Sequence, residues 1–124
     1  MSTSEEVSTI QRSANRDART LIQQLKDFNG SNAFSRTHHA TQDRPTDIYV
    51  VYSFGEHYPL YVAETMDGIT KWYENADWFS RTTSKHRSQF SPLQPTTKLT
   101  TNDMLRMTAY GIAGVVAQTK ILGY

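Results

Sequence analysis

Cysteine is absent from the 124-residue chain. Its absence excludes disulfide bonds, thiol nucleophiles, iron–sulfur clusters and zinc sites built from cysteine. Long apolar runs are missing as well, since none approaches the roughly 20 residues that a membrane-spanning helix needs. The polar, acidic N-terminus has no apolar core of a signal peptide. We therefore expect a cytoplasmic protein without a membrane partner.

A large net charge is also missing, because 13 basic residues face 12 acidic ones and the formal net charge is +1. No global electrostatic field marks the chain as a nucleic-acid-binding protein. The charge is nevertheless uneven along the sequence. Residues 76–98 hold four basic residues and one acidic residue, namely Arg81, Lys85, Arg87 and Lys98 against Asp77. This segment has a clear excess of basic residues and is the first candidate for contact with an anion.

The composition that is present is typical of a small globular domain. Hydrophobic residues make up 37% of the chain and charged residues 20%, which is lean in apolar side chains but not disordered. A chain of this length buries roughly two-thirds of its unfolded surface, so it folds without cross-links. We predict a single domain over residues 1–124, with no metal and no cofactor.

The N-terminal segment has helical periodicity over residues 5–28. Its apolar residues recur at steps of three and four, as Val7, Ile10, Ala14, Ala18, Leu21, Leu25 and Phe28. Asn29-Gly30 is a fitting stop signal. We expect this helix to pack on the protein's own sheet. The alternative is that its narrow apolar seam pairs with a second copy of the chain in a homodimer.

Residues 48–79 are predicted to form β-structure. Strands are expected at 48–54, 59–63 and 69–74, because these runs are rich in β-branched and aromatic residues and are separated by turn signals. The preceding segment, residues 29–47, lacks periodicity and is predicted to be a long loop.

A second helix is predicted over residues 102–119. Gly111 and Gly114 each cost about 1 kcal/mol relative to alanine in a helix interior. Either another backbone approaches them closely or the helix ends near Tyr110. The Ser/Thr-rich and basic segment 80–98 is expected at the surface. The predicted fold class is α+β, with an N-terminal helix, a three-stranded antiparallel meander and a C-terminal helix packed on the sheet.

One motif carries a resemblance. The segment Ser80-Arg81-Thr82-Thr83-Ser84-Lys85-His86 follows a tyrosine-rich region that contains Tyr52-Ser53-Phe54-Gly55, Pro59-Leu60 and Trp72-Tyr73-Glu74-Asn75. Over roughly residues 48–110 this pattern resembles a group of small uncharacterised proteins of bacteriophages and other mobile elements. The resemblance implies an accessory role in the cytoplasm of a host cell and carries no activity with it.

The candidate binding site combines basic, hydroxyl and aromatic residues: Trp72, Tyr73, Trp78, Arg81, Thr82, Thr83, Ser84, Lys85, His86 and Arg87. Basic and hydroxyl side chains can contact phosphate groups, and aromatic rings can stack on bases. We therefore expect a non-enzymatic protein that binds nucleic acid. In the competing structural interpretation, the aromatic residues belong to the core and the hydroxyl residues cap a turn.

Two other functions stay open. The near-neutral charge and the seven tyrosines suit a protein partner, in which case the chain is an inhibitor of a host defence protein. The second alternative is a small nuclease in which His86 acts as general base beside Lys85, Arg87 and a carboxylate such as Glu74. No catalytic motif supports it, so we assign no catalytic residue.

Overall fold

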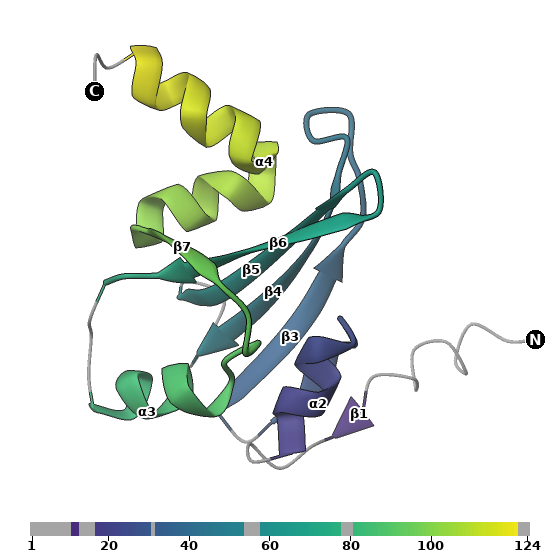
Figure 1. Cartoon of the computed structure of the whole chain (residues 1–124), viewed down its shortest axis with the longest axis vertical. Helices are drawn as coiled ribbons and strands as arrows, with labels where there is room; N and C mark the ends of the chain where they lie inside the picture. Colours follow the sequence, from purple (N-terminus) through teal and green to yellow (C-terminus); the bar gives the residue numbers. More distant parts are fainter. Residues whose placement is uncertain (1–10, 13–16, 31, 54–57, 78–80, 122–124) are drawn as a thin grey trace, which may run out of the picture.

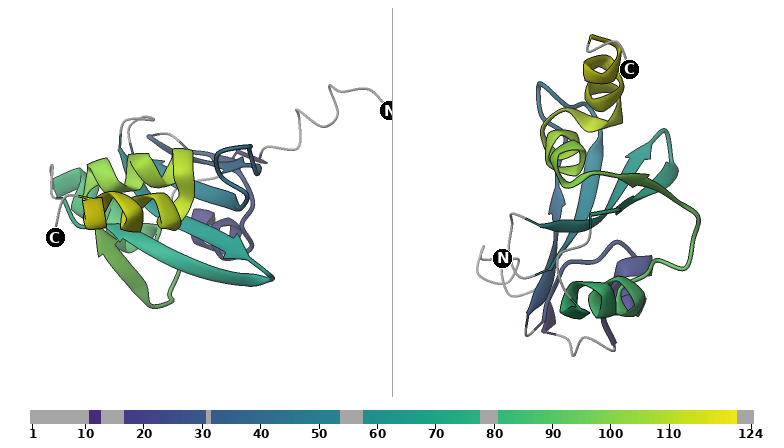
Figure 2. Two further views of the ribbon diagram at one scale, coloured as in Figure 1. Left: turned by 90° about the horizontal axis from the view of Figure 1, so that it is seen from above. Right: turned by 90° about the vertical axis from the view of Figure 1, so that its left-hand side faces the viewer.

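The computed structural model describes residues 11–12, 17–30, 32–53, 58–77 and 81–121, without the side chains of residues 11, 81–84 and 118–121. In this part of the chain, a seven-stranded mixed sheet carries helices on both faces (Figures 1 and 2). The strands are β1 (Gln11–Arg12), β2 (Phe28–Asn29), β3 (Ala33–His38), β4 (Asp47–Ser53), β5 (Pro59–Met66), β6 (Ile69–Asn75) and β7 (Thr96–Leu99). The helices are α2 (Ala18–Gln23), α3 (Arg81–Gln89) and α4 (Thr101–Ile121). The protein is therefore of the α+β class.

The strands lie in the sheet in the order in which they follow one another in the sequence. Neighbouring strands from β2 to β6 are antiparallel, whereas β1 pairs with β2 and β7 pairs with β6 in parallel. The prediction of a three-stranded meander is wrong, because the three predicted strands are only the centre of this sheet, β4 to β6. The extra strands are short or polar, so they carry little of the apolar signal by which strands are recognised.

Strand β3 shows why the predicted loop over 29–47 was wrong. Its sequence AFSRTH has few apolar residues, yet it pairs with β4 along its whole length, from Ala33 opposite Ser53 to His38 opposite Ile48. Ser35 is fully buried there because its hydroxyl has polar partners. A buried serine contributes nothing to a hydrophobic pattern, so a prediction based on hydrophobic periodicity does not detect this strand.

The continuous helix predicted over 5–28 is also wrong. Residues 1–10 and 13–16 lie outside the described part, but Gln11–Arg12 is a strand and the helix covers only Ala18–Gln23. Leu25 has a positive φ of 55°, which ends the helix, and Phe28 belongs to β2. The apolar residues still face one core, because Ala18, Ile22 and Phe28 pack in the same cluster. The described residues therefore contain no long seam for a homodimer.

Both faces of the central strands are covered, which explains their nearly continuous apolar sequence. One face packs Tyr49, Val51, Tyr61, Ala63 and Trp72 against residues of α2 and against Phe90, which directly follows α3. The other face packs Ile48, Val50, Tyr52, Val62 and Tyr73 against Met104, Met107 and Val115 of α4. Figure 2 shows α4 on one side of the sheet and α2 and α3 on the other. Each fully buried large apolar side chain contributes roughly 1.5–3 kcal/mol to this two-sided core.

Helix α4 begins where the sequence predicts and continues past Tyr110. Thr100 caps it by accepting a hydrogen bond from the backbone N–H of Asp103 at 3.2 Å. Asp77 accepts the N–H of Thr101 at 2.8 Å, and this hydrogen bond lowers the pKa of the Asp77 carboxyl. The helix kinks at Gly111, whose backbone has φ 73° and ψ −179°. The two halves of α4 therefore point in different directions, as Figure 1 shows.

Candidate functional site

The two aromatic residues of β6 in the predicted site are buried. Trp72 is 5% exposed and packs edge-on against Tyr49, with ring centroids 6.3 Å apart. Tyr73 is 6% exposed and lies on the opposite face of the sheet, in the core under α4. Trp78 lies outside the described residues. Because both faces are covered, strand alternation separates Trp72 from Tyr73 without exposing either of them, and neither ring is available to stack on a base.

The hydroxyl and basic segment forms a helix rather than a surface turn. Residues Arg81–Gln89 make up α3, and the side chains of 81–84, which include Arg81, Thr82, Thr83 and Ser84, are outside the described part. Lys85 is exposed, whereas His86 is 2% exposed. Lys85 and His86, which are adjacent residues of the predicted site, therefore have opposite surroundings: Lys85 lies in solvent and His86 in the core.

His86 connects α3 to the sheet. Its Nδ1 lies 2.7 Å from the hydroxyl of Ser53, which is also 2% exposed, and its ring packs against Phe90 with centroids 5.2 Å apart. Burial, and to a smaller degree the charge of Lys85, lowers the pKa of His86. A neutral, buried histidine has no contact with solvent through which to meet a substrate. This position favours a structural role for His86 over the general base of a nuclease.

Arg87 likewise has partners within the fold. It donates a hydrogen bond to the carbonyl of Asp77 at 2.9 Å, and its Nε lies 3.6 Å from a carboxylate oxygen of Glu74. Its own carbonyl accepts a hydrogen bond from the hydroxyl of Tyr61 at 2.6 Å. The guanidinium therefore ties α3 to β6, and Glu74 offsets part of its charge.

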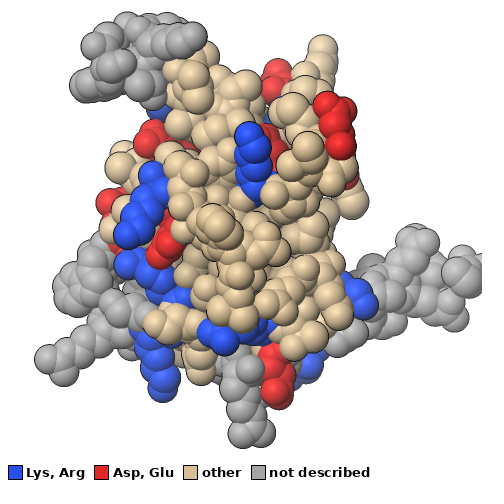
Figure 3. All heavy atoms as spheres, in the orientation of Figure 1, with Lys and Arg blue, Asp and Glu red and all other residues tan. Residues whose placement is uncertain are grey.

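Basic residues nevertheless gather on the side of the sheet that α2 and α3 cover. We define the α2–α3 layer as residues 17–29 and 81–90; it holds five basic residues, Arg19, Lys26, Arg81, Lys85 and Arg87, against two acidic ones, Asp17 and Asp27. Arg19 of α2 donates a hydrogen bond to the carbonyl of Ser88, so a side chain of α2 reaches α3. In Figure 3 the Lys and Arg side chains gather in the lower half of the view, where Figure 1 places α2 and α3.

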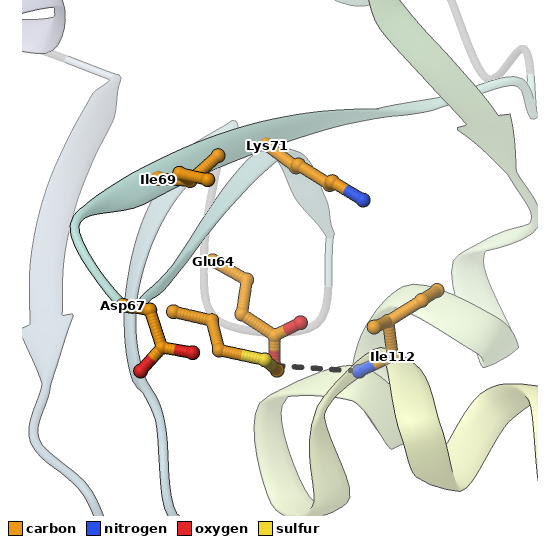
Figure 4. A pocket seen from close by; sticks show the side chains of 6 residues that line it. Glu64, Asp67, Ile69, Lys71 and Ile112 are labelled. Atoms are coloured by element: carbon orange, nitrogen blue, oxygen red, sulfur yellow. Dashed lines mark hydrogen bonds between the residues drawn. The ribbon is translucent and has the colours of Figure 1, made fainter.

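A second site lies at the opposite end of the sheet, between the β5–β6 hairpin and the outer half of α4. It is a pocket of about 210 Å³ lined by Glu64, Met66, Asp67, Ile69, Lys71 and Ile112 (Figure 4). Glu64 is 5% exposed; its Oε2 accepts hydrogen bonds from the Thr46 hydroxyl at 2.7 Å and from the backbone N–H of Ile112 at 3.4 Å. The first backbone N–H groups of a helix have no partner within the helix. The kink of α4 brings one of them, the N–H of Ile112 at the start of the outer half, to the buried carboxylate of Glu64.

Gly111 makes this contact possible. Its positive φ is a conformation that other residues adopt with strain, and a Cβ at this position would lie 2.5 Å from Oε2 of Glu64. The sequence left two alternatives for Gly111, close approach of another backbone or a helix end near Tyr110, and it assigned no role to Glu64. In the structure α4 kinks at Gly111, and the group that approaches it is the side chain of Glu64. Its position could have indicated a role, because Glu64 is an acidic residue in an apolar strand and lies two residues after the buried Val62, therefore on the same face of the sheet.

The comparisons with known proteins do not assign the chain to a family. No protein-family model, no curated protein and no solved structure matches the chain. The resemblance to phage and mobile-element proteins stays a prediction. Among the described residues, no helix is long and apolar enough to cross a membrane, and no three His, Asp or Glu side chains converge as a metal site would require.

Proposed function

We propose that the protein binds nucleic acid through phosphate contacts made by the α2–α3 layer. The observation that supports this is the excess of basic over acidic residues in the layer, five against two, in a chain whose formal net charge is only +1. The rest of the chain is consequently net acidic. Phosphate groups would therefore approach the α2–α3 side of the molecule in preference to any other.

The contacts in this proposal are electrostatic. Lys26 and Lys85 are exposed, and each can reach a phosphate without breaking a hydrogen bond of the fold that the structure shows among the described residues. Base stacking on Trp72 and Tyr73 plays no part, because both rings are buried. Binding is accordingly expected to depend on salt and to show little preference for base sequence. Together with the resemblance, this favours an accessory protein of a phage or mobile element that acts in the host cytoplasm.

The test is fluorescence anisotropy with a labelled single-stranded oligonucleotide of mixed sequence, measured at 50 and 200 mM salt. With about four phosphate contacts, the expected affinity loss between these concentrations is on the order of fifty-fold. A second oligonucleotide of unrelated sequence should bind within a few-fold of the first. Absence of binding at 50 mM salt would exclude the proposed function.

A further inference from the structure

The pocket at the β5–β6 hairpin has an apolar rim that is open to solvent. Met66 and Ile69 are paired across the hairpin and are 50% and 64% exposed. Val116, one helical turn beyond the pocket-lining Ile112, is 48% exposed. Exposed apolar side chains that cluster around a pocket indicate a contact surface, whereas scattered ones are ordinary.

The floor of the pocket is a carboxylate with unused hydrogen-bonding capacity. Both donors described above reach Oε2 of Glu64, and Oε1 accepts no hydrogen bond from any residue that the structure describes. Arg44 is buried close by, but its guanidinium donates to the carbonyls of His39, Thr46 and Thr108. Oε1 is not among the buried side-chain atoms that lack a hydrogen-bond partner, so it is accessible from the pocket, and a donor that enters the pocket can bind it.

The residues that line the pocket are net acidic, and the buried Arg44 lies beside Glu64 without lining the pocket. Two acidic residues, Glu64 and Asp67, and one basic residue, Lys71, line it. Lys71 stands opposite Glu64 in the β5–β6 register, is exposed and lines the same pocket (Figure 4). No Lys or Arg among the described residues forms an ion pair with Glu64. A positive group that enters from outside would find an acceptor in the carboxylate of Glu64.

The size of the pocket favours a side chain over a larger molecule. About 210 Å³ corresponds to roughly seven water molecules in the liquid and falls below the range of about 300–1,000 Å³ typical of small-molecule sites. The apolar rim extends beyond the cavity to Val116, which provides a surface for residues on either side of an inserted one.

From these observations we infer that the pocket binds a lysine or arginine side chain of a partner polypeptide. The methylene groups of the inserted side chain lie against Met66, Ile69 and Ile112, and its charged head donates to Oε1 of Glu64. Apolar residues that flank it in the partner cover the exposed rim. This site is independent of the proposed nucleic-acid surface, because it lies at the other end of the sheet and uses none of the same residues.

The test uses backbone amide NMR of the whole chain with two matched nonapeptides. Both have leucine at positions 4 and 6 in a Gly/Ser background, and position 5 is lysine in one and norleucine in the other. The lysine peptide should shift the amide signals of Gly111 and Ile112 and bind at least about tenfold more tightly than the norleucine peptide. Equal affinity of the two peptides would overturn the inference, and so would no shift with either.

Variants and a free amine complete the experiment. Glu64→Gln should remove the preference for lysine over norleucine, while the control Asp43→Asn, at an exposed position outside the pocket lining, should change the affinity by no more than about threefold. Should Glu64→Gln fail to fold, the peptide comparison on the native chain still decides the question. Pentane-1,5-diamine should bind at least tenfold more weakly than the lysine peptide, because it leaves the rim uncovered; equal binding would assign the pocket to free amines and overturn a polypeptide partner.

Discussion

At the scale of single residues, the surroundings determine the residue type at position 111 and the charge state of His86. Gly111 has to lack a side chain because its φ is 73° and Glu64 occupies the space of a Cβ. His86 has to be neutral because it is buried against Ser53 and Phe90. Neither requirement can be read from the local sequence alone, since Glu64 is 47 positions from Gly111 and Ser53 is 33 positions from His86.

Replacement of Gly111 by alanine should destabilise the protein by roughly 2–4 kcal/mol, because backbone strain and overpacking against Glu64 act together. The matched control is Gly68→Ala, where φ is also positive, at 78°, but no atom lies within 4 Å of the added Cβ. That variant should lose only about 1–2 kcal/mol. Urea unfolding of both variants gives the comparison, and equal losses would show that Glu64 does not restrict position 111.

The protein should lose stability as the pH falls below 6.5. The ordinary pKa of histidine, 6.5, applies to His86 in the unfolded chain, and burial lowers this pKa in the folded protein. Between the two pKa values the unfolded chain binds more protons than the folded one. The stabilisation is complete above pH 6.5 and is lost as the pH falls through the folded pKa. Urea midpoints at pH 7.5, 6.5 and 5.5 measure this effect.

His86→Gln should flatten that pH dependence, and His39→Gln, at an exposed position, should leave it as it is. A native protein whose urea midpoint does not change over this range would contradict the assignment of a neutral His86.

At the scale of elements, polar residues hold the outer strands to the centre. The hydroxyl of Ser35 in β3 accepts hydrogen bonds from the backbone N–H of Phe28 in β2 at 3.0 Å and from the hydroxyl of Tyr49 in β4 at 2.8 Å. Burial raises the pKa of Tyr49, so its hydroxyl stays protonated and able to donate. One small side chain therefore connects three strands.

Ser35→Ala should cost about 1–3 kcal/mol, because it removes the acceptor of a buried N–H group. Ser88→Ala in α3, at an exposed position, is the matched control and should stay within about 0.5 kcal/mol of the native protein. Thermal unfolding of both variants tests this, and a loss of less than 0.5 kcal/mol for Ser35→Ala would refute the role of Ser35 as a link between strands.

The elements also show how far the sequence could predict the fold. Strands β4 to β6 and helix α4 were predictable because their apolar periodicity is strong and local. Strand β3 was missed because its inward residues include Ser35, and α2 was overextended because Phe28 continues the helical spacing although it lies in a strand. Periodicity reports which residues face the core, and it does not report where the backbone changes direction between them.

At the scale of the whole molecule, the two candidate surfaces lie at opposite ends of the sheet and differ in chemistry. The α2–α3 layer is basic, and the pocket at the β5–β6 hairpin is apolar with an acidic floor. The sequence indicated the first through the local excess of charge at 76–98, although the aromatic half of that prediction, Trp72 and Tyr73, is buried in the core. It did not indicate the second, because that pocket forms only when the kink at Gly111 places Ile112 beside Glu64.

The most direct test of the central claim compares the salt dependence of oligonucleotide binding between the native protein and two variants. Lys26→Ala combined with Lys85→Ala should make the slope of log affinity against log salt shallower by about 1.4, because two phosphate contacts to a single strand are lost. Arg106→Ala, which removes a charge from α4 on the other face of the sheet, should leave the slope unchanged. If all three proteins have the same affinity and the same slope, the α2–α3 layer is not the nucleic-acid-binding surface.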